Sequence, residues 1–249
     1  MKIEFLGTGG FHPTETRHTT CLYLPDAAPD AAFILDAGSA FFRLMDKPLP
    51  PRLHLFLTHA HLDHVCGLTY WLDVAHGREC ELAVYATATV LETVAQNLFR
   101  SSLFPVPLDA RLHEINPDET FEVEGVRVST CEQTHPGTSL CYRFDWNVST
   151  HKSLCFATDT IGDGRNYHLM QECDLLIHER YFKAGQDKIA RKTGHSTVED
   201  ALRAQKQSGA KKLALMHFNP GAKLHPRDED AGIAPPETLY PNDGDIVEF

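Results

Sequence analysis

The stretch Thr58-His59-Ala60-His61-Leu62-Asp63-His64 decides the fold of this 249-residue chain. It follows an apolar run, Leu53 to Leu57, that is typical of a buried strand. Because the backbone turns outward where a strand ends, its three histidines and its aspartate can be directed at one point. Three imidazoles and a carboxylate are too many for one tetrahedral zinc once distant ligands are added, so we expect two metal ions. The alternative is a polar surface loop that is rich in histidine.

Outward from this stretch, short apolar runs predict strands along the whole chain. They cover residues 3–6, 21–24, 32–35, 53–57, 82–85, 123–128, 140–144, 154–157, 175–177 and 212–216. One amphipathic face predicts a helix through Val90, Leu91, Val94 and Leu98, and another through Val198, Ala201 and Leu202. For the second helix, Ser196 with Glu199 predicts a capping box and Gly209 the end. We expect one α/β domain over residues 1–249, with an irregular segment at 225–241.

Composition excludes several classes of function. With 23 Lys plus Arg against 34 Asp plus Glu, the net charge of −11 disfavours a general electrostatic grip on nucleic acid or an anionic membrane. No run reaches the roughly 18 apolar residues of a membrane-spanning helix, and Glu4 interrupts any signal peptide. Seven cysteines without a C-x-x-C pair suit reduced thiols. We therefore expect a soluble cytoplasmic protein with no membrane partner, whose 15 histidines are its distinctive feature.

The motif formed by His59, His61, Asp63 and His64 resembles the H-x-H-x-D-H motif of the metallo-β-lactamase superfamily. The resemblance implies a four-layer αββα sandwich. It also implies three further ligands: His135 in Gln-Thr-His-Pro, Asp159 in Ala-Thr-Asp-Thr and His217 in Leu-Met-His-Phe. One metal would be held by His59, His61 and His135, the other by Asp63, His64 and His217, with Asp159 bridging both. Nitrogen and oxygen ligands without thiolate favour two Zn²⁺ ions, with Mn²⁺ or Fe²⁺ as alternatives.

Further segments resemble the ribonuclease Z branch of that superfamily and its phosphodiesterase relatives. These are Phe5-Leu6-Gly7-Thr8-Gly9-Gly10, His178-Glu179 and Gly194-His195-Ser196-Thr197. Only 23 residues separate His135 from Asp159, which leaves no room for the arm with which the tRNA-processing enzymes grip tRNA. A small phosphodiester or an RNA end is therefore expected as substrate, and long nucleic acid is not. Since ribonuclease Z relatives are commonly homodimers, the resemblance also implies a homodimer.

The expected reaction is hydrolysis of a phosphodiester by a hydroxide that bridges the two metals. Asp63 would orient this hydroxide, His195 would protonate the leaving alkoxide, and Glu179 would tune His195. Each has a structural alternative: His195 could bond its own capping turn, and Glu179 could be a buried carboxylate that joins two strands. Arg143, in Cys-Tyr-Arg, is expected to be solvated or ion-paired rather than to bind substrate.

Three other functions share these features. A thioester or lactone hydrolase of the glyoxalase II kind would use the same first motif. A true RNA 3′-processing endonuclease would use the same metal centre. A noncatalytic binding module on this fold is disfavoured because all seven ligand positions are present. A panel of phosphodiester, thioester and lactone substrates would separate them.

Overall fold

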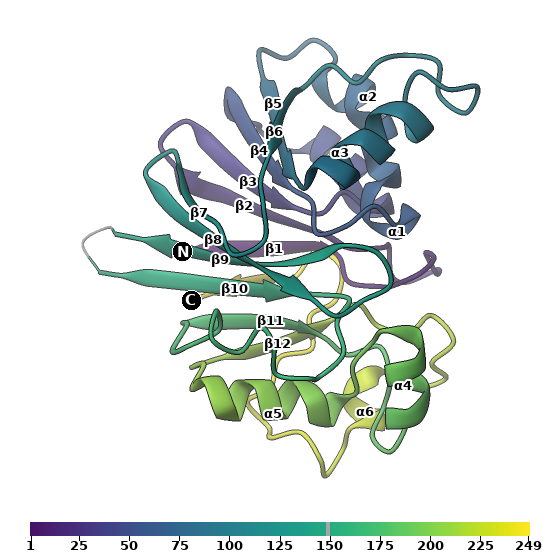
Figure 1. Ribbon diagram of the computed structural model, residues 1–249, viewed down its shortest axis with the longest axis vertical. Coiled ribbons are helices and arrows are strands. Elements are labelled where there is room, and N and C mark those ends of the chain that lie inside the picture. The colour runs from purple at the N-terminus through teal and green to yellow at the C-terminus, as the bar shows by residue number, and fades with distance from the viewer. Residues whose placement is uncertain (148–149) are drawn as a thin grey trace. The chain divides into compact units, whose positions relative to one another are not determined.

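The computed structural model describes residues 1–147 and 150–249, which contain two multistranded sheets with helices (Figure 1). Residues 1–116 and 242–248 form one compact unit, and residues 117–241 with Phe249 form a second. Both units combine strands and helices, so the predicted α/β class is confirmed. A single domain over residues 1–249 stays a prediction.

The first unit is built on a seven-stranded mixed sheet in the order β13-β1-β2-β3-β4-β5-β6. Its strands are β1 (Lys2–Gly7), β2 (Cys21–Ala28), β3 (Ala31–Leu35), β4 (Arg52–Phe56), β5 (Glu81–Ala86), β6 (Arg111–Glu114) and β13 (Ile246–Glu248). From β3 to β6 the strands run parallel, and every residue of β3 is buried. Parallel strands covered on both faces favour continuous apolar runs, which is the pattern of β3. In β4 the buried His54 interrupts the run.

Short helices cover the core of this unit. They are a 3₁₀ helix (Ser39–Asp46), α1 (Leu62–Val65), a second 3₁₀ helix (Cys66–Tyr70), α2 (Trp71–Ala75) and α3 (Ala88–Thr93), which continues as a π-helical turn (Val94–Leu98). Val90, Leu91 and Val94 are buried, as the predicted amphipathic face requires. The side chain of Thr87 accepts a hydrogen bond from the backbone NH of Val90 and caps α3.

The second unit is built on a six-stranded mixed sheet in the order β12-β11-β10-β9-β8-β7. Its strands are β7 (Thr120–Val123), β8 (Val126–Gln133), β9 (Ser139–Trp146), β10 (Lys152–Ala157), β11 (Leu175–Glu179) and β12 (Leu213–Met216). Its helices are α4 (Asp187–Thr193), α5 (Val198–Ser208) and α6 (Pro226–Glu229). In Figure 1, α5 lies along β11 and β12, the two strands that it contacts. Its buried Val198, Ala201 and Ala204 join the core there.

The prediction of one strand over 123–128 is wrong, because the chain makes a hairpin between β7 and β8. Glu124 and Gly125 form its turn, and both have positive φ, 52° and 77°. Two adjacent left-handed residues are typical of the tight turn that matches the twist of paired strands. The sequence carries a turn signal at this point, because the polar Glu124 and Gly125 separate the buried Val123 from the buried Val126.

The capping box of α5 lies one residue later than predicted. The Thr197 side chain accepts from the backbone NH of Asp200, whose carboxylate accepts from the backbone NH of Thr197. Ser196 instead donates its hydroxyl to the carbonyl of Thr160, 2.6 Å away. A long-range partner therefore decides which hydroxyl residue caps the helix. The predicted end is confirmed, because Gly209 is left-handed with φ 71°.

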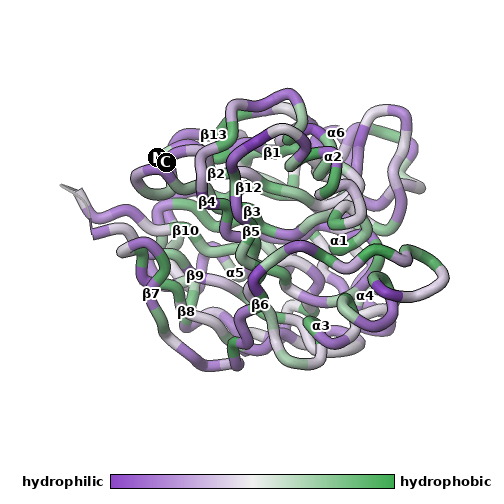
Figure 2. The backbone as a smooth tube through the Cα atoms, turned by 90° about the horizontal axis from the view of Figure 1, so that it is seen from above, coloured by the Kyte–Doolittle hydropathy of each residue, from purple (hydrophilic) through white to green (hydrophobic). Residues whose placement is uncertain are grey.

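Hydrophobic stretches of the chain coincide with strands, and hydrophilic stretches with many connecting loops (Figure 2). Within residues 1–147 and 150–249, every helix is too short or too polar to cross a membrane. The segment 225–241, predicted to be irregular, contains the short helix α6 followed by turns.

Candidate metal centre

The first unit gathers the four motif residues just beyond the carboxyl end of β4. His59 and His64 are buried, Asp63 is half-buried and His61 is exposed. Nε2 of His59 lies 2.9 Å from Nδ1 of His61. The short helix α1 places His64 Nε2 3.4 Å from Asp63 Oδ2. The sequence-predicted ligands of the motif are therefore clustered, with imidazole nitrogens and a carboxylate oxygen facing one another.

Asp36, directly after β3, organises this cluster although the sequence analysis did not single it out. Its fully buried carboxylate lies 2.8 Å from Nδ1 of His64 and accepts hydrogen bonds from the backbone NH and hydroxyl of Thr58. Burial raises the pKa of Asp36, and the adjacent His64 opposes that rise. With Nδ1–H directed at Asp36, His64 presents the lone pair of Nε2. A lone acid directly after a buried strand is the signal that could have revealed it.

Asp63 is held from a second direction by the backbone of the loop after β1. The NH of Phe11 donates to Oδ2 of Asp63 at 2.7 Å. Phe11 has a left-handed φ of 63° and an exposed side chain. A non-glycine residue in this conformation is held there by its surroundings, so the backbone NH is preorganised to orient the Asp63 carboxylate.

The second unit brings three predicted ligands to one edge of its sheet. His135 follows β8, Asp159 follows β10 and His217 follows β12. Strands β10 to β12 are parallel, and β8 runs with them because β9 is antiparallel to both β8 and β10. Their carboxyl ends therefore coincide. Oδ2 of Asp159 lies 3.5 Å from His135 Nε2, and Oδ1 lies 3.2 Å from His217 Nε2.

His135 is oriented by the backbone of the turn that follows α4. Its Nδ1–H donates to the carbonyl of Gly194 at 2.7 Å, which leaves the Nε2 lone pair facing Asp159. Burial lowers the pKa of His135, favouring the neutral imidazole that binds metal. Gly194 is left-handed with φ 83°, and a Cβ there would stand 2.3 Å from Cδ of Pro136. Only glycine permits this close approach.

Glu179 and His195 form the pair that the sequence analysis expected. Nδ1 of His195 lies 3.0 Å from Oε2 of the fully buried Glu179 and 3.8 Å from Oδ2 of Asp159. The other oxygen of Glu179 accepts the backbone NH of Thr160. The ring of Tyr181 stacks on His195 with centroids 4.4 Å apart and an angle of 16°. The imidazole of His195 is thus fixed by a carboxylate at its edge and an aromatic ring on its face.

His195 also lies within reach of two predicted ligands. Asp159, His195 and His217 each offer one ligand atom, and these atoms are all within 4.8 Å of one another. The alternative that the His195 side chain bonds the turn that caps α5 does not hold. Thr197 caps α5, and the ring of His195 pairs with Glu179. The geometry of His195 therefore suits two roles, that of a proton donor and that of an additional metal ligand.

Arg143 is ion-paired, as expected. Its guanidinium binds the carboxylate of Asp145 at 2.9 Å and donates to the carbonyls of Leu169 and Gln171 at 2.9 and 2.7 Å. His178 lies in β11 and is buried, and its Nδ1 bonds the backbone carbonyl of Glu179 at 2.8 Å. These polar groups are used in holding the fold.

The donor sets of both units fit divalent metal ions. In His64 and His135 a fixed acceptor holds Nδ1–H, so each Nε2 lone pair faces a carboxylate oxygen. Two electron-rich atoms 3.4 or 3.5 Å apart repel one another unless a cation lies between them. Imidazole nitrogen with carboxylate oxygen is a set that zinc accepts, and manganese or iron can replace it.

Comparisons with known proteins identify the family and the fold of the chain. Residues 23–218 match the model of the beta-lactamase superfamily domain. The ribonuclease Z of Methanothermobacter thermautotrophicus is 23% identical over 270 residues, covering 88% of this chain and 87% of that protein. The short form of human tRNase Z has a TM-score of 0.73 at 22% identity, covering 100% of this chain and 99% of that one. A diphosphatase of the PhnP family has a TM-score of 0.76 at 19% identity, covering 100% and 97%. The two structures show a shared fold.

Proposed function

This chain belongs to the beta-lactamase superfamily, and from that membership we propose that it hydrolyses small phosphodiesters with two divalent metal ions. It is a metal-dependent hydrolase with ribonuclease Z-like relatives. The observation that carries the finer proposal is the Glu179–His195 pair beside Asp159 and His217, because it adds a proton donor to a ligand set. Ligands alone would suit any hydrolase of this fold.

The proposed ligands are those that the family resemblance implies. One ion would be bound by His59, His61 and His135, the other by Asp63, His64 and His217, and Asp159 would bridge them. Asp159 supports the bridging assignment, since its two oxygens face two different histidines. We propose zinc as the metal, with manganese or iron as alternatives, because thiolate is missing from this donor set.

The bound ions would supply an activated water and charge neutralisation at the phosphate. The residues of the chain do the rest. Asp63, oriented by the NH of Phe11, can accept a hydrogen bond from the attacking water and align it. His195 can donate a proton to the leaving oxygen, while Glu179 holds its ring and stabilises its protonated form.

This pair favours a phosphodiester over a thioester. An alkoxide is a strong base and needs a proton as it leaves, whereas a thiolate, with a thiol pKa of about 8.5, leaves readily without one. A dedicated proton donor is therefore most useful when the leaving group is a sugar hydroxyl. An RNA end contains the same bond, and a relative named ribonuclease Z makes it the second candidate.

Metal analysis combined with a substrate panel tests the proposal. We expect two metal ions per chain, hydrolysis of bis-p-nitrophenyl phosphate and of a 2′,3′-cyclic nucleotide, and loss of both activities on chelation. A pre-tRNA substrate in the same panel tests the second candidate. Hydrolysis of an acyl thioester or a lactone alone would contradict the phosphodiesterase proposal. A metal-free preparation that still bound a partner would point to a noncatalytic module.

Two properties of the whole molecule are also part of the proposal. We propose a homodimer, which light scattering of the purified protein would test. We also propose a cytoplasmic location, which fractionation of the producing cells would test. A monomer, or recovery outside the cytoplasm, would contradict the respective expectation.

A further inference from the structure

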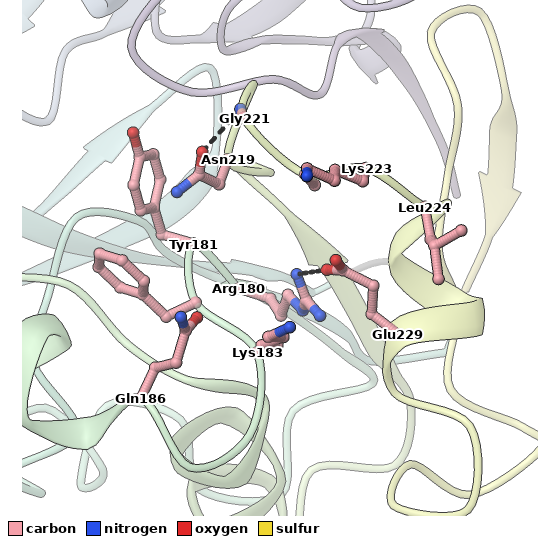
Figure 3. A pocket seen from close by; sticks show the side chains of 11 residues that line it. Arg180, Tyr181, Lys183, Gln186, Asn219, Gly221, Lys223, Leu224 and Glu229 are labelled. Carbon is pink, nitrogen blue, oxygen red and sulfur yellow. Dashed lines mark hydrogen bonds and ion pairs between the residues drawn. The ribbon is translucent and has the colours of Figure 1, made fainter.

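A pocket of about 550 Å³ opens in the second unit, outside the ligand set already described (Figure 3). Its walls come from residues 180–186, which follow β11, residues 219–224, which follow the ligand His217, and Glu229 of α6. Pockets of this size are typical of sites for small molecules. The lining is mixed, with the aromatic Tyr181 and Phe182 beside the charged and amide side chains of Lys183, Lys223 and Asn219.

One buried arginine, Arg180, forms ion pairs with the two carboxylates at this pocket. The Arg180 side chain is 1% exposed and binds Glu229 at 3.0 Å and Asp230 at 2.9 Å. Tyr240 donates its hydroxyl to the same Asp230 at 3.0 Å. Burying a guanidinium requires such compensation. The negative charges of Glu229 and Asp230 are therefore both paired with Arg180.

The cationic groups of the pocket other than Arg180 are two lysines, and the amides of Asn219 and Gln186 lie beside them. Neither Lys183 nor Lys223 makes an ion pair with any residue within 1–147 and 150–249, and both are exposed. In Figure 3 their side chains lie on either side of the Arg180–Glu229 pair. Asn219 accepts the backbone NH of Gly221 with its side-chain oxygen at 2.8 Å, which leaves its amide NH₂ as a donor. Two ammonium groups and an amide donor make a pocket that favours an anion, in a chain with net charge −11.

The pocket shares a wall with the proposed active site. Tyr181 lines the pocket, and its ring stacks on His195 at 4.4 Å and lies 5.5 Å from His217. Asn219 follows His217 by two residues. A ligand in the pocket is therefore separated from the proposed proton donor by one aromatic ring.

We propose that this pocket binds a terminal phosphate of the substrate, so that the preferred substrate is a small phosphodiester carrying a second phosphoryl group. Lys183 and Lys223 bind the two negative charges of this group, and Asn219 donates to one of its oxygens. The inference rests on the proposed function for the scissile bond, but the pocket itself is formed by residues that are not metal ligands.

Two matched probes test it: the p-nitrophenyl ester of thymidine 5′-phosphate, with and without a 3′-phosphate. We expect the wild-type kcat/KM to be about tenfold higher for the probe with the 3′-phosphate, the effect of charge-assisted hydrogen bonds. Lys183→Gln and Lys223→Gln should each remove most of this preference. Lys192→Gln, an exposed lysine on α4 outside the pocket, is the matched control and should keep the preference and the basal rate.

Calorimetry with thymidine 3′,5′-bisphosphate against thymidine 5′-monophosphate provides a readout without turnover. We expect tighter binding of the bisphosphate, lost in Lys183→Gln and Lys223→Gln. If the enzyme hydrolyses bis-p-nitrophenyl phosphate but has the same kcat/KM for both probes, the pocket assignment is overturned and the proposed function stands. Lysine-dependent binding of the bisphosphate without hydrolysis of any phosphodiester supports the pocket and overturns the proposed function. If the protein shows neither lysine-dependent binding of the bisphosphate nor hydrolysis of a phosphodiester, the pocket assignment and the proposed function are both overturned.

Discussion

Replacing His195 by alanine should slow hydrolysis only when the leaving group needs a proton. The structure places Nδ1 of His195 3.0 Å from Glu179, and 14% of its side chain is exposed, so the ring is held firmly and remains open to substrate. A sugar alkoxide depends on a proton donor, whereas p-nitrophenolate is stable as an anion near neutral pH. The two kinds of substrate therefore separate proton donation from metal binding.

General acid catalysis contributes roughly 10²–10⁴-fold, so His195→Ala should lower kcat on a 2′,3′-cyclic nucleotide by that factor, about 3–5 kcal/mol in the barrier. On bis-p-nitrophenyl phosphate the change should stay within about threefold, because the proton demand of the leaving group is small. Glu179→Gln keeps a hydrogen-bond partner but removes the negative charge, and should show a smaller loss with the same selectivity for leaving group.

The assay is kcat on both substrates, with metal content measured for every variant. His168→Ala is the matched control, since His168 is exposed and its Nδ1 bonds the backbone carbonyl of Arg165 at 3.0 Å. Equal losses on both substrates together with reduced metal would show that His195 is a ligand. An unchanged rate on the cyclic nucleotide at full metal content would refute the proton-donor role.

Further predictions concern the residues that hold the site. Asp36→Asn should weaken metal binding by about 10–100-fold, measured by competition with a chelator, and unchanged affinity would contradict its orienting role. Asp230→Ala should lower the free energy of unfolding in urea by about 3–5 kcal/mol, because Arg180 stays buried with half its compensation. A loss below about 1 kcal/mol would show that the remaining carboxylate suffices. Gly194→Ala should cost more than about 1 kcal/mol and reduce metal content, since both φ and a nearby proline ring oppose a Cβ. Gly185→Ala, with φ 77° in open space, isolates the backbone effect.

Much of the fold follows from local patterns. The buried strand β3 is a continuous apolar run, and α5 ends where Gly209 adopts a left-handed conformation. The exceptions depend on contacts that a pattern does not contain. The turn at Glu124 and Gly125 pairs two strands that the spacing of the valines had joined into one. The cap of α5 passes to Thr197 because Ser196 donates its hydroxyl to Thr160.

The sequence by itself determined the chemistry of the candidate ligands, because residue type and position at a strand end are local properties. Tertiary structure decided which partner each polar group has. Asp36 meets His64 across 28 positions, and Arg180 meets Asp230 across 50. These pairings decide which imidazole nitrogen carries a lone pair and which lysines keep an uncompensated charge. Both depend on the distance between charges in space, and the order of residues along the chain does not specify that distance.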